Sequence, residues 1–250
     1  MTHYQNSPII ETVCEFRFPA ATEWIENIAE LFYDKIKEQF PIREERSEIS
    51  IKATINVKSS ESQLPADRKI TPIHIFRSED KKLLIQMAVR RLSIHFIKPY
   101  SSWDDFYPAI QLAYDALKSL IKVTGFERIG LLYLDRIEFE SPGSVQLMDY
   151  FTIYPVVSKS LPQKMVNFAV GCDFLYDDRD ICRVNLQAIP SEKKGNYAAM
   201  LTTDYFLWKK EALSVDEVFT WIGNAHSRSN EIFDHCITDK LAKMFGREDL

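Results

Sequence analysis

Positively charged side chains gather between residues 77 and 98 of this acidic chain. Six Lys or Arg residues oppose only Glu79 and Asp80 there, a local net charge of six minus two, or +4, in a chain of net charge −5. Charged connectors commonly keep sheet edges soluble, and an anion-binding surface for a nucleotide or nucleic acid is the alternative. The absence of an aromatic stacking motif disfavours nucleic acid. The candidate anion-binding residues are Arg77, Arg90, Arg91 and His95.

Three charged residues interrupt strands that are otherwise apolar. Asp135 and Arg136 stand within RIGLLYLDRIEFE (128–140), and Asp204 stands within LTTDYFLW. A charge inside so apolar a strand must be paired or must reach an edge. These residues therefore predict a functional pocket or, as the alternative, a structural salt bridge or a strand bulge.

The histidines and cysteines form no recognisable site. His226 and His235 are nine residues apart in a predicted helix and point to opposite faces. Glu231, His235 and Asp239 share a stripe whose ends are about 12 Å apart, too far for one ion. The chain has no GxSxG, and its cysteines lie in apolar patterns. We predict no catalytic residue, no metal and no cofactor.

The composition is that of an ordinary globular protein. The 250 residues are 46% hydrophobic and 27% charged, enough to bury a core. The net charge of −5 gives no general attraction to nucleic acid or anionic membranes. No apolar run approaches the length of about 18 residues typical of a transmembrane helix, and no signal peptide is recognisable. Together with scattered cysteines, these features predict a cytoplasmic protein that binds no membrane.

Alternating and helical periodicities define the expected elements. Helices are predicted from Thr22 to Phe40 and from Ser102 to Gly125, with a short one at 145–151. REERSE (43–48) reads as a solvated charge run and 58–71 as a surface loop. The predicted strands are 14–18, 49–57, 73–77, 83–89, 92–97, 128–140, 166–176, 182–189 and 200–208.

The last predicted helix runs from Ser214 to Gly246. Ser214 and Glu217 match a capping box, and Gly246 supplies a left-handed stop. A helix of about 32 residues would be about 48 Å long. Because that exceeds the width of a compact domain of this size, we expect one end to overhang or to meet a partner.

The chain also suggests two similar halves, residues 1–125 and 126–250, within one intimate unit. Each half closes with a similar helix end, LIKVTG at 120–125 and LAKMFG at 241–246. Good helix ends resemble one another in any case, which is the alternative to duplication. The predicted fold is α+β, with mostly antiparallel sheets in two similar halves, each packed against a long helix.

Short motifs in a fixed order resemble a known family. They are PIIETVCEFRF, WDDF after Pro99 and Tyr100, GLLYLDRIEF, LTTDYF and the closing AHSRSNEIFDHCITDKLAKMFG. Nearly the whole chain looks like a sporadically distributed bacterial family of about 250 residues, the length of this chain, with no assigned function. The resemblance implies no reaction, but patchy distribution is typical of accessory and defence loci.

The family's mid-chain pattern runs Gly-Leu-Arg-Tyr-Ile-Asn. Gly130, Leu131 and Tyr133 match it, whereas Leu132 replaces the Arg and Asp135 replaces the Asn. A site that depended on that Arg and Asn would therefore be altered in this chain.

These observations favour a non-enzymatic binding or regulatory subunit. We expect it to assemble through its C-terminal helix with a protein partner or another copy, in a bacterial defence (antiphage) system. The alternative is a sensor or enzyme for an anionic small molecule, such as a nucleotide, bound by the four candidate residues between 77 and 98. Nucleic-acid binding is a third hypothesis, and would depend strongly on salt.

Overall fold

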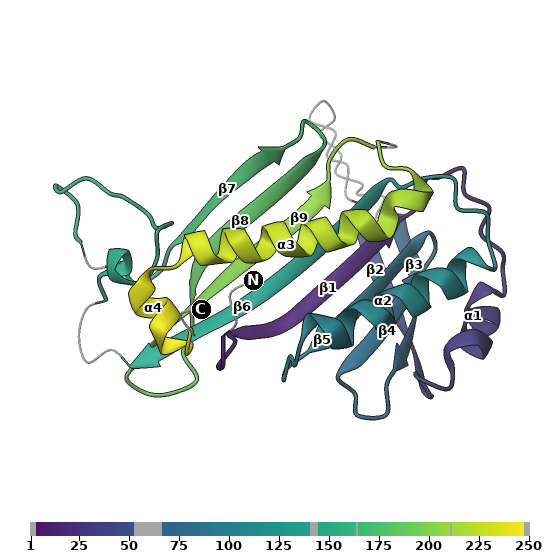
Figure 1. Ribbon diagram of the computed structural model, residues 1–250, viewed down its shortest axis with the longest axis horizontal. Helices are drawn as coiled ribbons and strands as arrows, with labels where there is room; N and C mark the ends of the chain where they lie inside the picture. The colour runs from purple at the N-terminus through teal and green to yellow at the C-terminus, as the bar shows by residue number, and fades with distance from the viewer. Residues whose placement is uncertain (1–3, 53–66, 141–144, 164, 211, 248–250) are drawn as a thin grey trace, which may run out of the picture.

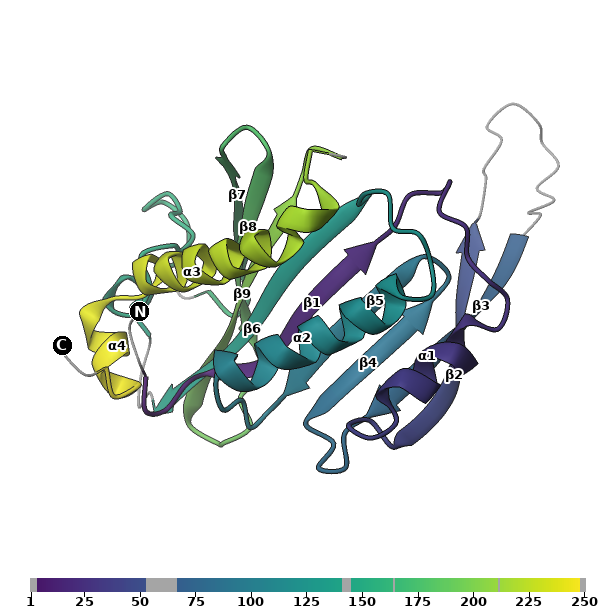
Figure 2. The same ribbon diagram turned by 45° about the vertical axis from the view of Figure 1, so that its right-hand side comes forward.

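The computed structural model describes residues 4–52, 67–140, 145–163, 165–210 and 212–247. Within these residues the chain forms one antiparallel nine-stranded sheet and four α-helices, which confirms the predicted α+β class. Three of the helices cover the same face of the sheet (Figures 1 and 2).

The helices are short relative to the sheet. They are α1 (Ile28–Ile36), α2 (Trp103–Lys118), α3 (Val218–Cys236) and α4 (Asp239–Met244), with the 3₁₀ turns η1 (Leu147–Asp149) and η2 (Val215–Glu217). The strands are β1 (Ile9–Arg17), β2 (Ile42–Lys52), β3 (Asp67–Arg77), β4 (Leu83–Ala88), β5 (Arg91–Ile97), β6 (Arg128–Glu140), β7 (Ala169–Tyr176), β8 (Asp180–Ile189) and β9 (Asn196–Leu207). None of the described helices is long and apolar enough to cross a membrane.

The strands follow the order β2-β3-β4-β5-β1-β6-β9-β8-β7 across the sheet. Strands from residues 1–125 thus occupy one side and strands from 126–250 the other, and β1 and β6 join them. Helix α2 packs on β4 and β5, while α3 packs on β6 and β9. One hydrophobic core fills the space between the helices and the sheet.

Most predicted elements are present because their apolar residues alternate regularly. In β1, buried Cys14 and Phe16 alternate with more exposed neighbours, and β6 has the bounds 128–140 expected from its sequence. Ser102 caps α2, its hydroxyl accepting a hydrogen bond from the Asp105 amide at 3.2 Å. Pro108 lies inside this helix.

Two predictions near the N-terminus are wrong. Thr22 does not begin a helix, since α1 starts only at Ile28. The solvated charge run 43–48 belongs to β2, which begins at Ile42 and not at the predicted residue 49. As an outer strand with no buried residue between 42 and 48, β2 lacks the alternation that marks a half-buried strand. Residues 53–66, which hold part of a predicted strand and loop, lie outside the described residues.

The predicted helix of about 32 residues is also wrong. The capping box of Ser214 and Glu217 is present, but α3 ends at Cys236 and Ile237 is extended. Ile237 pairs with Phe151 in an isolated bridge, and the Thr238 amide donates to the Tyr150 carbonyl at 2.9 Å. These bonds to the η1 segment replace helical ones, and Thr238 then caps α4. Within the described residues, no helix approaches the predicted length.

Candidate functional site

The sheet face opposite α1, α2 and α3, which we call the open face, carries a row of side chains from seven strands. Phe16 stacks on Tyr114 of α2, so its neighbour Glu15 points to the open face. Directly paired residues of adjacent strands share a face. From β7 to β4 the row is Leu175, Ile181, Phe206, Gly130, Glu15, Ser93 and Gln86.

Arg128 is the centre of a charged network on this face. Its Nη2 donates to both carboxylate oxygens of Asp204 at 2.7 and 2.8 Å, and its Nη1 donates to Glu15 at 2.9 Å. The guanidinium also lies over the Phe206 ring, 4.8 Å from its centroid. The side chains of all three charged residues are about four-fifths buried, so the network joins β1, β6 and β9 tightly.

Gly130 makes room for this arrangement. A Cβ atom at this position would stand 2.5 Å from the Nη1 atom of Arg128 and 2.9 Å from its Cζ atom. No side chain fits there without moving the guanidinium, so the glycine allows Arg128 to lie flat along β6 toward Asp204.

Two opposing effects act on the pKa of the Asp204 carboxyl. Burial raises this pKa above the usual value, while the positive charge and hydrogen bonds of Arg128 lower it. Burial is the larger effect. The charged form of Asp204 therefore depends on Arg128.

A groove of about 730 Å³ runs along this face and exposes aromatic and charged side chains together. Trp208, which is 61% exposed, lines it beside Phe206. The volume lies within the range typical of ligand sites. The groove's charged residues, and the histidine that lines it, are Glu15, Arg17, Glu48, Arg91, His95, Arg128, Arg183 and Asp204.

The four candidate anion-binding residues do not converge. Arg91 and His95 line the groove, where Arg91 pairs with Glu48 at 2.9 Å. His95 contacts Glu11 at 2.7 Å and Ser93 at 3.0 Å. Arg77 lies two strands away on β3 and pairs with Glu44 at 3.1 Å. Arg90 stands at the turn before β5. Three of the four thus have an acidic partner already.

Arg90 differs from the other three. It adopts a left-handed φ of 56°, and its guanidinium donates to the Ala20 carbonyl at 3.0 Å. It borders a separate hollow of about 380 Å³, which Arg17 and Arg91 also line. The hollow thus brings together two of the four candidate residues, Arg90 and Arg91.

Asp135, Arg136 and Asp204 do not form one pocket. Successive residues of a strand point to opposite faces, so Asp135 faces α3 while Arg136 faces away from it. Arg136 donates to Glu138 at 3.0 Å and to the Pro190 carbonyl at 2.8 Å. Asp204 belongs to the Arg128 network instead. Arg136 and Asp204 therefore form structural salt bridges, with Glu138 and Arg128, which was the alternative to a functional pocket.

Sequence reasoning missed the residues that make the groove. Arg128, Glu15 and Arg183 occupy outward positions of alternating strands, which by themselves indicate only solvent exposure. Their proximity cannot be read from the local sequence, because β1, β6 and β9 become neighbours only in the folded sheet. The exposed Trp208 at the end of β9 was the one local hint, since aromatic residues at strand ends are unusual surface groups.

Burial makes two thiols and one imidazole poorly suited to catalysis. Burial raises the pKa of Cys182 to about 12 and that of Cys236 to about 11, which keeps both thiols protonated. His226 stacks on Trp103 with centroids 3.9 Å apart and contacts the Tyr133 hydroxyl at 2.7 Å. Burial lowers the pKa of His226 to about 4, so its ring is neutral.

Comparison of the chain with known protein families and with curated proteins finds no match.

Proposed function

We propose that the protein is a non-enzymatic binding or regulatory subunit that recognises a protein partner through the open-face groove. The observation that carries the proposal is the exposed Trp208 beside Phe206, Arg128 and Arg183 on a sheet face without helices. Arg and aromatic residues are the types enriched at the energetic centres of protein interfaces.

The charges of the groove favour a protein over a free anion. Each of its four arginines has an acidic partner, so an anion would compete with carboxylates already in place. A protein surface carrying both charges can complement both kinds of residue. The pairs are Arg17–Glu15, Arg91–Glu48, Arg128–Asp204 and Arg183–Asp173.

An apolar side chain extends this surface beyond the groove. Leu175 of the outer strand β7 stands in the same cross-strand row as Phe206 and is 59% exposed. A small molecule in the groove would leave it in water. A protein partner would bury it together with Trp208, which adds hydrophobic stabilisation.

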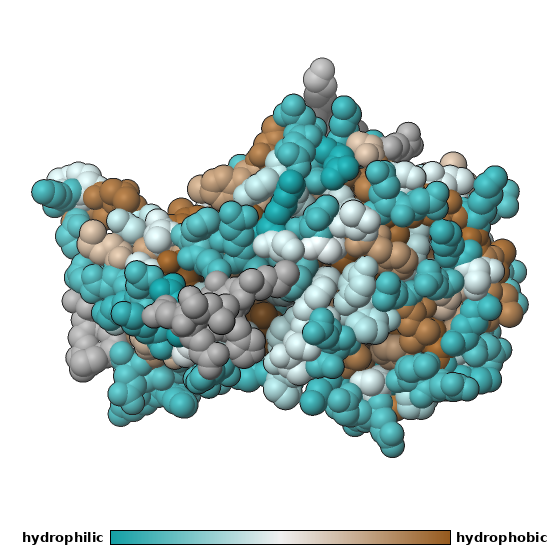
Figure 3. Space-filling model, viewed as in Figure 1, coloured by the Kyte–Doolittle hydropathy of each residue, from teal (hydrophilic) through white to brown (hydrophobic). Residues whose placement is uncertain are grey.

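The groove replaces the C-terminal helix as the proposed contact surface. The outward positions of α3 are polar, and the surface along this helix is mostly hydrophilic or neutral in Figure 3. The exposed residues of α3 are Thr220, Asn224, Ser227, Glu231 and His235. Without an overhang, little about α3 favours a partner there.

A matched pair of double variants tests the proposal. Arg183→Ala with Trp208→Ala alters side chains that are 48% and 61% exposed, so the fold should persist. Thr220→Ala with Glu231→Ala is the control on α3. A partner recovered with the wild-type chain, or a second copy detected by light scattering, is titrated against each purified variant.

We expect the groove variant to bind about tenfold or more weakly and the control to bind like wild type. A strict monomer that captures no partner contradicts the proposal. So does a groove variant with wild-type affinity.

The hollow beside Arg90 supports a second candidate, a sensor or enzyme for an anionic small molecule. Arg90 is the one candidate cation whose described contact is a carbonyl instead of a carboxylate. A thermal-shift panel of nucleotides tests it, because a ligand at 100 times its dissociation constant stabilises by about 2.7 kcal/mol. Arg90→Ala should abolish any such shift, and a flat panel removes this candidate.

The biological setting of the proposal rests on the family resemblance alone. The patchy distribution of that family is typical of accessory and defence loci. We therefore propose that the protein is a cytoplasmic subunit of a bacterial antiphage defence system.

We also propose that residues 1–125 and 126–250 are similar halves. Both halves contribute a central strand, β1 or β6, and both have a helix on the same face of the sheet, α2 or α3. Their other strands continue outward as β5-β4-β3 and β9-β8-β7. The outermost strand β2 has no counterpart in this alignment.

A further inference from the structure

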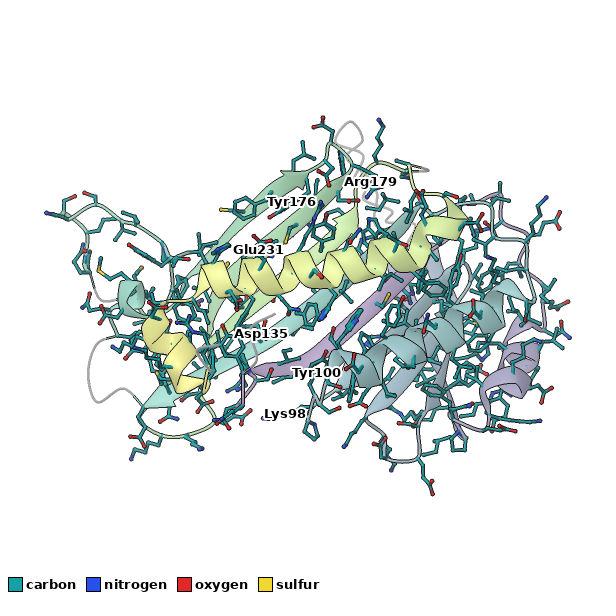
Figure 4. The ribbon with its side chains drawn as sticks, viewed as in Figure 1. Lys98, Tyr100, Asp135, Tyr176, Arg179 and Glu231 are labelled. Carbon is teal, nitrogen blue, oxygen red and sulfur yellow. The ribbon has the colours of Figure 1, made fainter. Side chains whose placement is uncertain are left out.

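A small polar cavity lies between the sheet and α3, away from the open face. Its volume is about 40 Å³, and Asp135, Thr203 and Ser229 line it. Figure 4 shows Asp135 on β6 beside the C-terminal half of α3. A cavity needs about 10–15 Å³ to hold a water molecule, so this one has room for a small ligand.

The register of the sheet explains how the three groups meet. Asp135 pairs with Leu201 of β9, which makes Thr203 its diagonal neighbour on the same face. Ser229 comes from α3, whose buried side packs over both strands. Three elements distant in sequence thus contribute one oxygen-bearing side chain each.

These three side chains are deeply buried and lack partners. Asp135 and Ser229 are 2% exposed and Thr203 is 1% exposed. Within the described residues, neither hydroxyl makes a hydrogen bond. Burial is the only influence on the pKa of the Asp135 carboxyl among these residues, with no hydrogen bond or charge acting on it. Buried polar groups are nearly always satisfied, so this arrangement points to a ligand.

The charge of the cavity indicates the sign of that ligand. Its described lining includes the carboxyls of Asp135 and Asp234 but no Lys, Arg or His. The titratable groups that face Asp135 are Tyr4, Tyr133, Asp234 and Cys236. Each of them is neutral or negative, so the cavity offers no cation of its own among the described residues.

We propose that this cavity binds a small monovalent cation, held by oxygen atoms of Asp135, Thr203 and Ser229. Carboxylate and hydroxyl oxygens are hard ligands that suit alkali ions and ammonium. Divalent ions generally require more carboxylates. The site is separate from the groove, and the proposal stands independently of the proposed function.

Thermal unfolding of the full chain tests this proposal. Chloride salts of Na⁺, K⁺ and NH₄⁺ are compared at equal ionic strength with choline chloride, whose cation is too large for the cavity. The comparison is made at about pH 9, above the pKa of about 8 to which burial raises the Asp135 carboxyl. There we expect one of the three cations to raise Tm by roughly 2–4 °C. The chloride salt that raises Tm identifies the cation that the cavity binds.

Asp135→Asn is the decisive control, because the amide keeps the shape of the side chain but loses its charge. It should abolish the cation-specific shift, and Thr203→Val should reduce it if the first variant does not fold. Equal shifts in wild type and variants overturn the proposal. No shift in any arm also overturns it and assigns the cavity to water.

Discussion

At the scale of single residues, Arg128 and Gly130 are interdependent. The guanidinium of Arg128 reaches Asp204 and Glu15 only because Gly130 has no side chain in its path. Their role could not be predicted from the sequence, because nothing local distinguishes a glycine that accommodates an arginine from one that ends a turn.

Gly130→Ala should therefore displace Arg128. We expect the free energy of unfolding to fall by about 1–3 kcal/mol at neutral pH, since the partly buried Asp204 would lose its partner. Urea unfolding measures the loss. The pKa of Asp204 should rise further in the variant, because Arg128 lowers this pKa in the wild-type chain.

Gly125→Ala is the matched control. A Cβ at Gly125 would have no atom within 4 Å, so its effect should stay within about 0.5 kcal/mol. Equal losses in the two variants would show that the Arg128 network does not depend on Gly130.

Asp135 should make stability depend on pH. Burial raises the pKa of its carboxyl from 3.8 to about 8. Between these two pH values the folded state holds a proton that the unfolded state has released. The contribution of Asp135 to stability is therefore complete below about pH 4 and is lost as pH rises toward 8. Because Asn cannot ionise, Asp135→Asn should gain stability relative to wild type across this range.

Unfolding of both proteins between about pH 4 and 8 measures this gain. The comparison is made in choline buffer, so that no small cation complicates it. A difference between variant and wild type that stays constant with pH would count against a buried, protonated Asp135.

At the scale of elements, strands were predictable where one face is buried. β1 and β6 alternate clearly; β6 has its predicted bounds, while β1 begins at Ile9 instead of residue 14. The outer strand β2 has no buried residue between 42 and 48, so only its part from residue 49 onward is predicted as a strand. The end of α3 was missed for another reason. The helical stripe continues through Ile237 and Thr238, but both are β-branched, and Thr238 makes a better cap than an interior residue.

Thr238→Ala should destabilise this junction. The Thr238 hydroxyl accepts from the Leu241 amide at 3.4 Å and donates to the Asp149 carbonyl at 2.7 Å. We expect a loss of about 1–2 kcal/mol in chemical unfolding. Thr220→Ala on the exposed side of α3 should change little, and a similar loss there would argue against a specific cap.

At the scale of the whole molecule, one sheet presents two different faces. Helices cover the core face, while the other face assembles charges from strands that are far apart in the sequence. Local alternation predicted most of the strands. It could not predict the contacts of β1 with β6 or of β6 with β9, on which the groove depends.

We propose that a partner binds this open face and not the C-terminal helices α3 and α4. Hydroxyl-radical footprinting of the full chain, alone and in its complex, tests it by the oxidation of two exposed side chains. Trp208 lines the groove, and Met244 lies on α4 and is 47% exposed. We expect complex formation to protect Trp208 several-fold and to leave Met244 unchanged. Protection of Met244 with full reactivity at Trp208 would contradict it.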